Sequence, residues 1–359
     1  MIAFVVKRIG YALLILWGVL TVIFLIFTVM PGDPARMMMG QRADEQTLEK
    51  IRQELGLHEP IPVQYLHYLN DLSPLSFFRH DAPKHYFYLD TNQYPPHTTL
   101  FKGSKWMMVL KGPYMGRSFQ QNRAVGAILK ETFPNTLVLA FASIVFASVL
   151  GIAMGVIAAL FHQTWVDRML LTLSALGMSI PSFFAAILIG WLFAFKLGDL
   201  TGLPLTGNLF EVDDFGEGVQ LHLSHLILPA LTLGIRPLSV VLQLMRNALL
   251  DVFNQDFITT ARAKGVPFRR ILFRHAFPNA LNPVITAVSG WFASMLAGVV
   301  FVEYIFGWKG LGNVIVDALN KYDLPLVMGC ILSIACIFII VNTLVDLAYA
   351  WLDPRVRVR

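Results

Sequence analysis

The sequence predicts an all-α membrane protein with six transmembrane helices. Of its 359 residues, 56% are hydrophobic and only 14% are charged, and the mean hydropathy is +0.61. Soluble domains carry about a quarter charged residues, so this chain has more apolar surface than a water-soluble core can bury, and lipid is its expected solvent. Apolar runs of roughly 20 residues, the length that one bilayer-spanning helix needs, recur along the chain.

The six predicted spans are long apolar runs almost free of charge. The first is expected to be a retained anchor, because it is longer than the apolar region of a signal peptide and is followed by Pro31-Gly32-Asp33-Pro34 instead of a small-residue cleavage site. The fourth contains one charge, Arg236. The predicted spans are residues 9–30, 132–161, 169–195, 226–245, 276–302 and 324–345.

The lysines and arginines of the short loops predict the orientation of the spans. Cytoplasmic loops carry an excess of these residues, and the rule is best satisfied when both termini are cytoplasmic. The cytoplasmic side then carries Lys7, Arg8, Arg168, the basic stretch 256–281 and the tail arginines Arg355, Arg357 and Arg359, against Lys196, Lys309 and Lys321 outside. The formal charge of +5 is mild and occurs in patches, and we expect no nucleic-acid partner.

The predicted domains are residues 1–30 with the first span, an extracytoplasmic segment 31–131, and a core 132–359 with the other five spans. In the extracytoplasmic segment, Asp44 to Leu55 is predicted as a capped helix that Gly56 ends, and Gln64 to Leu72 as a second helix.

Residues 73–113 form a distinct insertion that is rich in aromatic residues and lysines. We expect a small folded excursion, since the segment is too aromatic for a disordered linker. His85 to Leu89 and Thr98 to Phe101 have strand character around the Tyr94-Pro95-Pro96 turn.

The basic stretch in the middle of the chain, residues 256–281, has the residue pattern of two helices joined by a tight turn, and we call it the elbow. Asp256 is predicted to cap a helix that runs to Lys264, Gly265 to end it, and Pro267 to begin the next helix. An ordinary loop needs only a few residues. The elbow is therefore either a handle for another protein or an interfacial helix on anionic lipid. Its basic residues are Arg262, Lys264, Arg269, Arg270 and Arg274.

Ala261-Arg262-Ala263-Lys264-Gly265, with Pro278 downstream, resembles the cytoplasmic coupling motif of ABC importer permeases, and its form is similar to the dipeptide, oligopeptide and nickel branch. The family pattern is Glu-Ala-Ala, three residues, Gly, nine residues, Ile-x-Leu-Pro. Aligned on Gly265, the first three positions are Thr259-Thr260-Ala261 and the last four are His275-Ala276-Phe277-Pro278. The acidic residue and the first alanine of the pattern are therefore absent.

Other stretches resemble the same branch in the same order, over nearly all of the chain except residues 73–113. They are Lys7-Arg8, Pro31-Gly32-Asp33-Pro34, Phe133-Pro134-Asn135-Thr136-Leu137, Ser179-Ile180-Pro181, Val302-Glu303-Tyr304-Ile305-Phe306, Gly310-Leu311-Gly312 and Leu352-Asp353-Pro354-Arg355.

The resemblance implies the first of two permease subunits of a peptide importer, with the type I (MetI-like) permease fold, in the bacterial inner membrane. The substrate implied is a di- or oligopeptide, with a nickel complex or a glutathione-like peptide as alternatives. The implied partners are a second homologous permease subunit, two ATP-binding subunits, an extracytoplasmic substrate-binding protein and membrane lipid. Because it is exported and dense in aromatic and basic residues, the insertion 73–113 is expected to help receive the binding protein; the alternative is a passive lid that packs only against its own subunit or the second permease. The helix at about 256–277 would contact the ATPases through Thr259, Thr260, Ala261, Arg262, Ala263, Lys264 and Gly265.

The chain itself lacks the Gly-x-x-x-x-Gly-Lys-Ser/Thr loop that cradles phosphates. We therefore expect a transport subunit that is not an enzyme and has no cofactor of its own, with ATP and Mg²⁺ bound by the partners. A secondary transporter would need paired ionisable groups at midspan, and an intramembrane enzyme a buried catalytic pair. Neither pattern is evident.

Arg236 has two interpretations, since a charge within a span costs at least about 2.5 kcal/mol on insertion scales. It either bonds carbonyls exposed by the kink at Pro237, near the outer edge, or lines the passage. Gly151 and Gly155 permit close helix packing, with a gating hinge as the alternative.

His222 and His225 at the outer mouth are interpreted as interfacial residues, with a shared metal as the less favoured alternative; no metal site is expected. Glu303 either faces the substrate or is solvated beside Lys309.

Overall fold

The computed structural model describes most of the chain, which forms two compact units. The units are Met1–Val5, Thr132–Asn313 and Ile337–Arg359 (unit 1) and Val6–Glu131 with Val314–Cys336 (unit 2). The Pro31-Gly32-Asp33-Pro34 stretch, Pro95 and the tail arginines lie outside the described residues. The described residues are 2–29, 36, 44–54, 56–82, 85–90, 94, 96–212 and 218–352.

Four described helices are long and apolar enough to cross a membrane, or five if one bent pair counts as a single span. They fall on the first, second, fourth and sixth predicted spans, which are thus confirmed as apolar helices. The predicted count of six is not reached by this measure in the described part of the chain. The four helices are α1 (Ile2–Val29), α5 (Val125–Leu160), α9 (Ser224–Phe253) and α15 (Leu324–Leu352).

The third predicted span is not one straight helix. The chain bends by 111° between α6 (Trp165–Ser179) and the segment Ser182–Lys196, which comprises α7 (Ser182–Ile189) and a π-helical stretch η2 (Gly190–Lys196). Ile180 is extended, with φ −75° and ψ 125°. Proline disfavours the helical conformation of the preceding residue and offers no N–H, so Pro181 ends α6 and starts a new direction.

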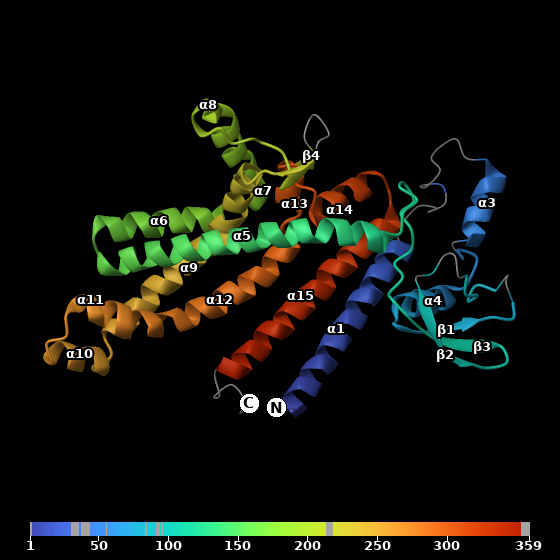
Figure 1. Cartoon of the computed structure of the whole chain (residues 1–359), viewed down its shortest axis with the longest axis horizontal. Helices are drawn as coiled ribbons and strands as arrows, with labels where there is room; N and C mark the ends of the chain where they lie inside the picture. Colours follow the sequence, from blue (N-terminus) through green and yellow to red (C-terminus); the bar gives the residue numbers. More distant parts are fainter. Residues whose placement is uncertain are drawn as a thin grey trace. The chain divides into compact units, whose positions relative to one another are not determined.

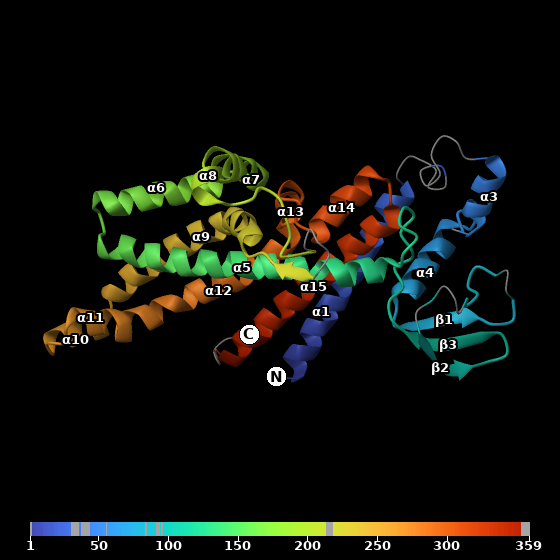
Figure 2. The same ribbon diagram turned by 45° about the horizontal axis from the view of Figure 1, so that its top comes forward.

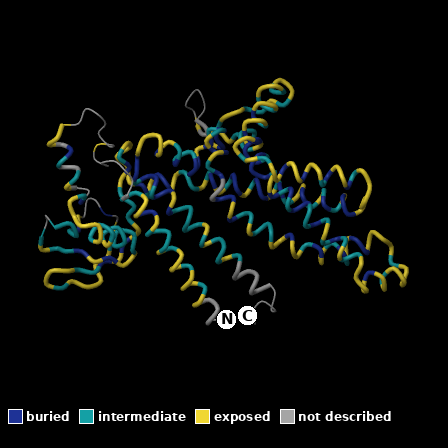
Figure 3. The backbone as a smooth tube through the Cα atoms, turned by 180° about the vertical axis from the view of Figure 1, so that it is seen from behind, coloured by how far each residue is buried: buried dark blue, intermediate teal, exposed yellow. Residues whose placement is uncertain are grey.

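In unit 1, α9 packs against α5, α6 and α12 (Phe277–Gly298) (Figure 1). A Cβ at Gly151 would lie 2.9 Å from the Leu238 carbonyl, and one at Gly155 2.7 Å from the Leu242 carbonyl. The predicted close packing of these glycines is therefore confirmed, and α9 is the neighbour that they admit. Buried residues follow the seams between these helices, while outward faces are exposed (Figure 3).

The remaining elements of unit 1 are short. They are α8 (Gly198–Thr201), a hairpin of β4 (Phe210–Val212) and β5 (Val219–Leu221), α10 (Asp256–Ala263), α11 (Phe268–Arg270), a π-helical segment η3 (Ile271–Ala276) and α13 (Val300–Ile305). Helix α14 (Leu311–Asn320) begins in unit 1 and continues in unit 2.

Unit 2 combines helices with a three-stranded antiparallel sheet of order β1-β3-β2. The sheet residues Phe78 and Val109 pack with Leu89 and Tyr94 in a small core. The elements of this unit include α3 (Glu45–Glu54), α4 (Ile61–Leu72), β1 (Leu75–Arg79), β2 (His97–Lys102) and β3 (Trp106–Lys111).

The predicted helix before Gly56 is confirmed as α3, except that Leu55 lies outside the described residues. The Gln46 amide donates to Asp44 Oδ1 at 2.7 Å, which is the expected N-terminal cap. At the other end Gly56 has φ +64°, and the Leu57 amide donates to the Arg52 carbonyl at 2.9 Å. The second predicted helix is also confirmed as α4, which starts three residues earlier than Gln64.

The strand predicted for Thr98 to Phe101 is confirmed as part of β2, but the one predicted for His85 to Leu89 is wrong. Only Tyr88 in that run makes a bridge, an isolated one to Arg79. The strand that pairs with β3 on the side away from β2 is instead β1, a segment for which the sequence predicts no strand. Aromatic residues favour strands because they fit a half-buried surface, and here Tyr86 satisfies the same preference by stacking on the His67 ring at 4.1 Å.

Candidate functional site

The predicted elbow is present in unit 1 as α10 and the turn that follows it. Figure 2 shows α10 at the far end of α9, beside α11. Ile258 is fully buried in a cluster with Leu249 of α9 and Ile271 of η3. The predicted coupling residues Thr259, Thr260, Arg262, Ala263, Lys264 and Gly265 are exposed, and Ala261 is half-buried. The Ile258 side chain thus anchors α10, and the opposite face of the helix is exposed.

Gly265 ends α10 in the left-handed conformation that the sequence predicted. Its φ is +71°, its amide donates to the Arg262 carbonyl at 3.0 Å, and the Val266 amide donates to the Ala261 carbonyl at 3.1 Å. This bond pair defines a Schellman helix end. A Cβ at Gly265 would meet nothing within 4 Å, so the backbone conformation alone requires glycine here.

The start of the elbow differs from the prediction. Asp256 is the first helical residue, whereas the capping position is held by the extended Gln255, and no side-chain cap bond forms. Pro267 likewise caps α11 and does not start it. Helix ends commonly shift by one residue in this way. The basic residues Arg269, Arg270 and Arg274 are exposed along α11 and η3.

A buried ion pair that the sequence does not predict lies in the same unit. Asp167, only 2% exposed, accepts two hydrogen bonds from the Arg246 guanidinium, at 2.6 Å from Nε and 2.7 Å from Nη2. The Gln163 amide also donates to Asp167 Oδ2 at 2.9 Å, and His162 Nδ1 lies 3.2 Å from the same oxygen. The α5–α6 turn is thereby clamped to α9, the helix that leads into α10.

The sequence offers only a weak indication of this ion pair: Asp167 precedes the third predicted span and Arg246 follows the fourth. Residues 167 and 246 are far apart in the sequence, and neither spacing nor periodicity relates them.

Arg236 lies near the middle of α9. Its Nε and Nη2 atoms both reach the Met178 carbonyl at 3.4 Å, and its side chain is exposed. Met178 is in the last turn of α6, directly before the bend at Pro181. The carbonyl that Arg236 contacts thus belongs to the α6–α7 bend, whereas the sequence predicts contact with carbonyls exposed by a kink at Pro237.

Glu303 is neither solvated nor open, contrary to both interpretations of the sequence. It is fully buried, and the Gly312 amide donates to its Oε2 at 2.6 Å. Trp308 Nε1 donates to the Asn135 carbonyl at 3.0 Å, and the Leu311 amide to Thr136 Oγ1 at 2.8 Å. Three of the motif stretches therefore meet here, since Thr136 and Gly312 both contact the Glu303 carboxylate.

The histidine pair also has a structural role. His222 and His225 stack with ring centroids 5.2 Å apart, and His225 Nδ1 lies 2.8 Å from the Asn208 carbonyl. In the described part of the chain, no group of three or more His, Cys, Asp or Glu residues is placed to hold a metal.

Sequence comparison decides the family. Residues 151–358 match the family described as binding-protein-dependent transport system inner membrane component, and residues 1–80 match its N-terminal region. The chain belongs to this family. A binding-protein-dependent transport component with several long apolar helices is a multi-pass membrane protein, and α10 with Gly265 lies inside the matched region.

Curated relatives of this transport component match it over nearly their whole length. The probable D,D-dipeptide transport system permease protein DdpB of Escherichia coli K12 is 33% identical over 96% of this chain and 94% of its own. The di/tripeptide transport system permease protein DppB of Pseudomonas aeruginosa is 33% identical over 99% of both chains. The glutathione transport system permease protein GsiC of Salmonella typhimurium is 32% identical, again over 99% of both.

Among solved structures, an inward-facing MetNI methionine ABC transporter chain aligns with 64% of this chain and 97% of its own, at 16% identity and a TM-score of 0.47.

Proposed function

We propose that this chain is the first of two permease subunits of an ATP-driven ABC importer, and that it carries di- or oligopeptides across the bacterial inner membrane. Family membership and relatives named for D,D-dipeptide, di/tripeptide and glutathione transport support the peptide class. A glutathione-like peptide is the second candidate, favoured by the glutathione permease relatives. A nickel complex is a third possibility, carried from the motif resemblance alone.

The proposed topology has six spans with both termini in the cytoplasm. The bent α6–α7 segment then counts as the third span and α12 with α13 as the fifth, although neither is a single straight apolar helix. In this arrangement α10 is cytoplasmic and unit 2 carries the extracytoplasmic sheet.

The proposed partners divide the work of transport. Two ATP-binding subunits hold ATP and Mg²⁺ and perform the hydrolysis, so this chain is a transport component and not an enzyme. A second homologous permease subunit forms the other half of the passage, and an extracytoplasmic binding protein delivers the substrate.

The observation that carries the proposal is the exposed α10, anchored by one buried residue. Thr259, Thr260, Ala261, Arg262, Ala263, Lys264 and Gly265 would contact a groove of an ATPase subunit. Because Ile258 is buried against Leu249 and Ile271, a displacement of α10 would be passed to α9 and η3. The Asp167–Arg246 clamp would then pass it from α9 to α6. Arg236, on the same helix, is the proposed passage-lining residue.

The sheet of unit 2 is the proposed contact for the binding protein. Phe77, Phe101 and Trp106 are exposed there and border a groove that also includes Lys105. Aromatic residues supply contact area at protein interfaces, and a lysine would favour an acidic partner surface.

The test is Gly265→Val in the reconstituted complex. A β-branched residue at a left-handed φ costs about 1–3 kcal/mol, so the helix end should rearrange while the rest of the chain folds. We expect ATP hydrolysis to continue and substrate uptake to fall by about tenfold, the factor that 1.4 kcal/mol corresponds to. Gly290→Val is the matched control, because Gly290 also has open space around its Cβ position but an ordinary φ. Normal uptake by Gly265→Val would contradict the coupling role.

A further inference from the structure

The segment that follows α10 carries a basic patch on its exposed side. The patch combines exposed arginines of α11 and η3 with two phenylalanines that are 50% and 64% exposed. The other side of the same segment is covered, because Ile271 and Leu272 are buried with Leu249 of α9. The residues of the basic patch are Phe268, Arg269, Arg270, Phe273 and Arg274.

The charge of the basic patch is not balanced by neighbouring carboxylates. No acidic residue occurs in the sequence from Phe257 to Val302. Among the described residues, the guanidinium groups of Arg269, Arg270 and Arg274 make no hydrogen bond or ion pair. A guanidinium is a planar set of donors that matches phosphate oxygens in pairs. The basic patch therefore fits a surface that presents phosphate groups.

The two phenylalanines indicate which surface this is. A basic segment with exposed aromatic side chains is typical of elements that lie in the membrane interface. There the rings can enter the boundary between headgroups and acyl chains, whereas a soluble anion would leave them in water. Residues 259–265 of the elbow, which are proposed to contact an ATPase, include no aromatic residue. The two halves of the elbow thus present different chemistry.

The depth of the arginines agrees with a lipid contact. Segment η3 leads directly into α12, with α11 just before it (Figure 2). Arg274 lies two residues and Arg269 seven residues before residue 276, where the fifth span is predicted to begin. At 1.5 Å per residue this corresponds to about 3–10 Å along the helix axis. The headgroup layer on each side of a bilayer is about 5–8 Å thick, so these arginines reach the level of the lipid phosphates.

The α5–α6 turn marks the same level. Trp165, at the start of α6, is 71% exposed, and the nearby Arg168 is also exposed. Tryptophan is enriched where a membrane meets water. Figures 1 and 2 both show this turn at the same end of unit 1 as α11. Two aromatic and basic segments, distant in sequence, therefore occupy one end of the unit.

We propose that the basic patch binds the headgroup phosphates of anionic phospholipids in the cytoplasmic leaflet. The arginines donate to phosphate oxygens, and the phenylalanines enter the boundary with the acyl chains. The proposal rests on the proposed topology, which places this end of unit 1 at the cytoplasmic surface. The elbow then has two kinds of contact, with α10 facing an ATPase and the basic patch facing lipid, so that lipid holds the base of the elbow while α10 moves.

Lipid binding by the purified full chain tests the proposal. Native mass spectrometry in detergent measures the half-saturating concentrations of phosphatidylglycerol and of phosphatidylcholine with the same acyl chains. Both lipids have a phosphate, but only phosphatidylglycerol has a net negative charge. Each arginine near an anionic surface strengthens binding about fivefold. We expect phosphatidylglycerol to bind about tenfold more tightly or better, and Arg270→Gln with Arg274→Gln to remove most of this preference.

Arg262→Gln with Lys264→Gln is the matched control. It also removes two exposed positive charges from the elbow, but from α10 and not from the basic patch. This control should keep most of the preference for phosphatidylglycerol, and melting temperatures confirm that both double variants are folded. An equal loss of preference in the two double variants would overturn the proposal, because the attraction would then depend on the total charge of the elbow. Equal binding of the two lipids by the parent chain would also overturn it.

Photo-cross-linking decides between lipid and protein as the occupant. The photoreactive amino acid p-benzoylphenylalanine replaces Phe273 in cells that make the chain together with its transport partners, and inner-membrane vesicles are irradiated. We expect cross-links to phospholipid, whereas cross-links to an ATP-binding subunit would assign the basic patch to protein and overturn the proposal. Lipid binding by the purified chain needs neither ATP nor a partner chain. It can therefore fail while the Gly265→Val test of coupling succeeds, and the reverse.

Discussion

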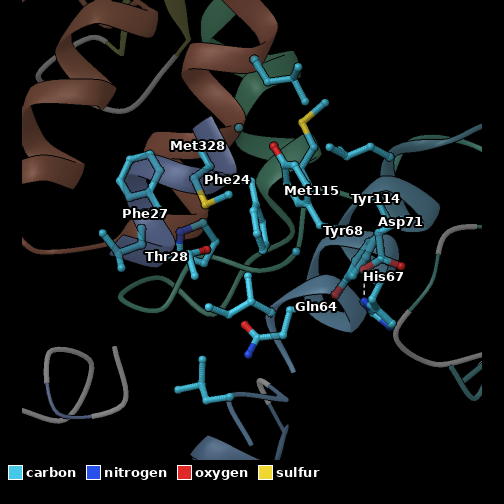
Figure 4. Close-up of a pocket in the computed structure, with 18 of the residues that line it drawn as sticks. Phe24, Phe27, Thr28, Gln64, His67, Tyr68, Asp71, Tyr114, Met115 and Met328 are labelled. Carbon is cyan, nitrogen blue, oxygen red and sulfur yellow. Dashed lines mark ion pairs between the residues drawn. The ribbon is translucent and has the colours of Figure 1, made fainter. Parts of the chain in front are cut away.

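The two units hold a buried aspartate in contrasting ways. In unit 1, Asp167 receives both hydrogen bonds of a guanidinium, that of Arg246, at 2.6 and 2.7 Å. In unit 2, Asp71 faces the Tyr94 phenol and, as Figure 4 shows, the His67 imidazole. The nearby ammonium of Lys111 donates to the main-chain carbonyl of Asp71 and not to its carboxylate.

The two aspartates should therefore respond differently to pH: the Asp167–Arg246 pair is a fixed contact, whereas the Asp71 carboxyl titrates. A bidentate guanidinium–carboxylate pair is geometrically specific and strongly bonded, so the clamp at Asp167 should hold α6 and α9 together under all ordinary conditions. Burial raises the pKa of Asp71 to about 7 and lowers the pKa of His67 to about 4. Their 3.4 Å contact would be an ion pair only if His67 were protonated, and burial favours the neutral forms of both groups.

The largest effect is expected from breaking the clamp. Arg246→Ala leaves Asp167 buried without its partner, and removing one member of a buried pair costs roughly 3–5 kcal/mol. We expect about 3 kcal/mol, the lower end of that range, because the Arg246 side chain is 13% exposed. The free energy of unfolding of the purified chain, from SDS titration, measures this.

Two variants control that measurement. The double variant Asp167→Asn with Arg246→Gln should recover part of the loss, since no charge is left unpaired. Arg123→Ala breaks a pair with Glu131 in which both side chains are exposed, and should cost about 0–1 kcal/mol. Similar losses for Arg246→Ala and Arg123→Ala would show that the clamp is no stronger than a surface pair.

A change of pH is expected to have an intermediate effect on the stability of unit 2. The pKa of Asp71 is raised above its ordinary 3.8, so its contribution to stability is full at low pH and is lost as pH rises toward about 7. The pKa of His67 is lowered below its ordinary 6.5, so its contribution is present above that value and is lost as pH falls toward about 4. Between these limits the two trends oppose each other.

Single variants should reveal each trend. In the Asp71→Asn variant only the His67 trend remains, so the stability of unit 2 should increase as pH rises from about 4 to 6.5. In the His67→Phe variant only the Asp71 trend remains, so the stability of unit 2 should decrease as pH rises from about 4 to 7. Hydrogen-exchange protection of β1–β3 amides, corrected for the intrinsic effect of pH, reports this locally. If Asp71→Asn has the same pH profile as the parent chain, the carboxyl does not titrate as described.

The smallest effect on stability is expected at Arg236. Its hydrogen bonds to the Met178 carbonyl are long, 3.4 Å, and its side chain is exposed, so Arg236→Ala should cost under about 1 kcal/mol. If Arg236 lines the passage, uptake falls while the ATPases still assemble. Gln243→Ala is the control, because Gln243 also contacts Met178 but is neutral. Equal uptake by the Arg236→Ala variant and the parent chain would remove the passage role.

Local features of the structure were largely predictable. The stops at Gly56 and Gly265 followed from a glycine after a periodic helix, and both have the left-handed φ that only glycine adopts at little cost. Gly151 and Gly155 predicted a close helix contact, although their partner α9 could not be named in advance. The strand predicted at His85 to Leu89 failed because aromatic content does not distinguish a ladder from ring packing.

By itself, the sequence determined the membrane class, the apolar helices, the left-handed helix ends and the exposed basic elbow, because these depend on composition and on neighbours within a few residues. Only the tertiary structure decided that Arg246 meets Asp167, that Glu303 is buried beneath Gly312, and that the Tyr94 hydroxyl donates to Asp71. These contacts join elements distant in sequence or depend on which face of a helix is covered. Three-dimensional packing sets both, and no local pattern of residues encodes them.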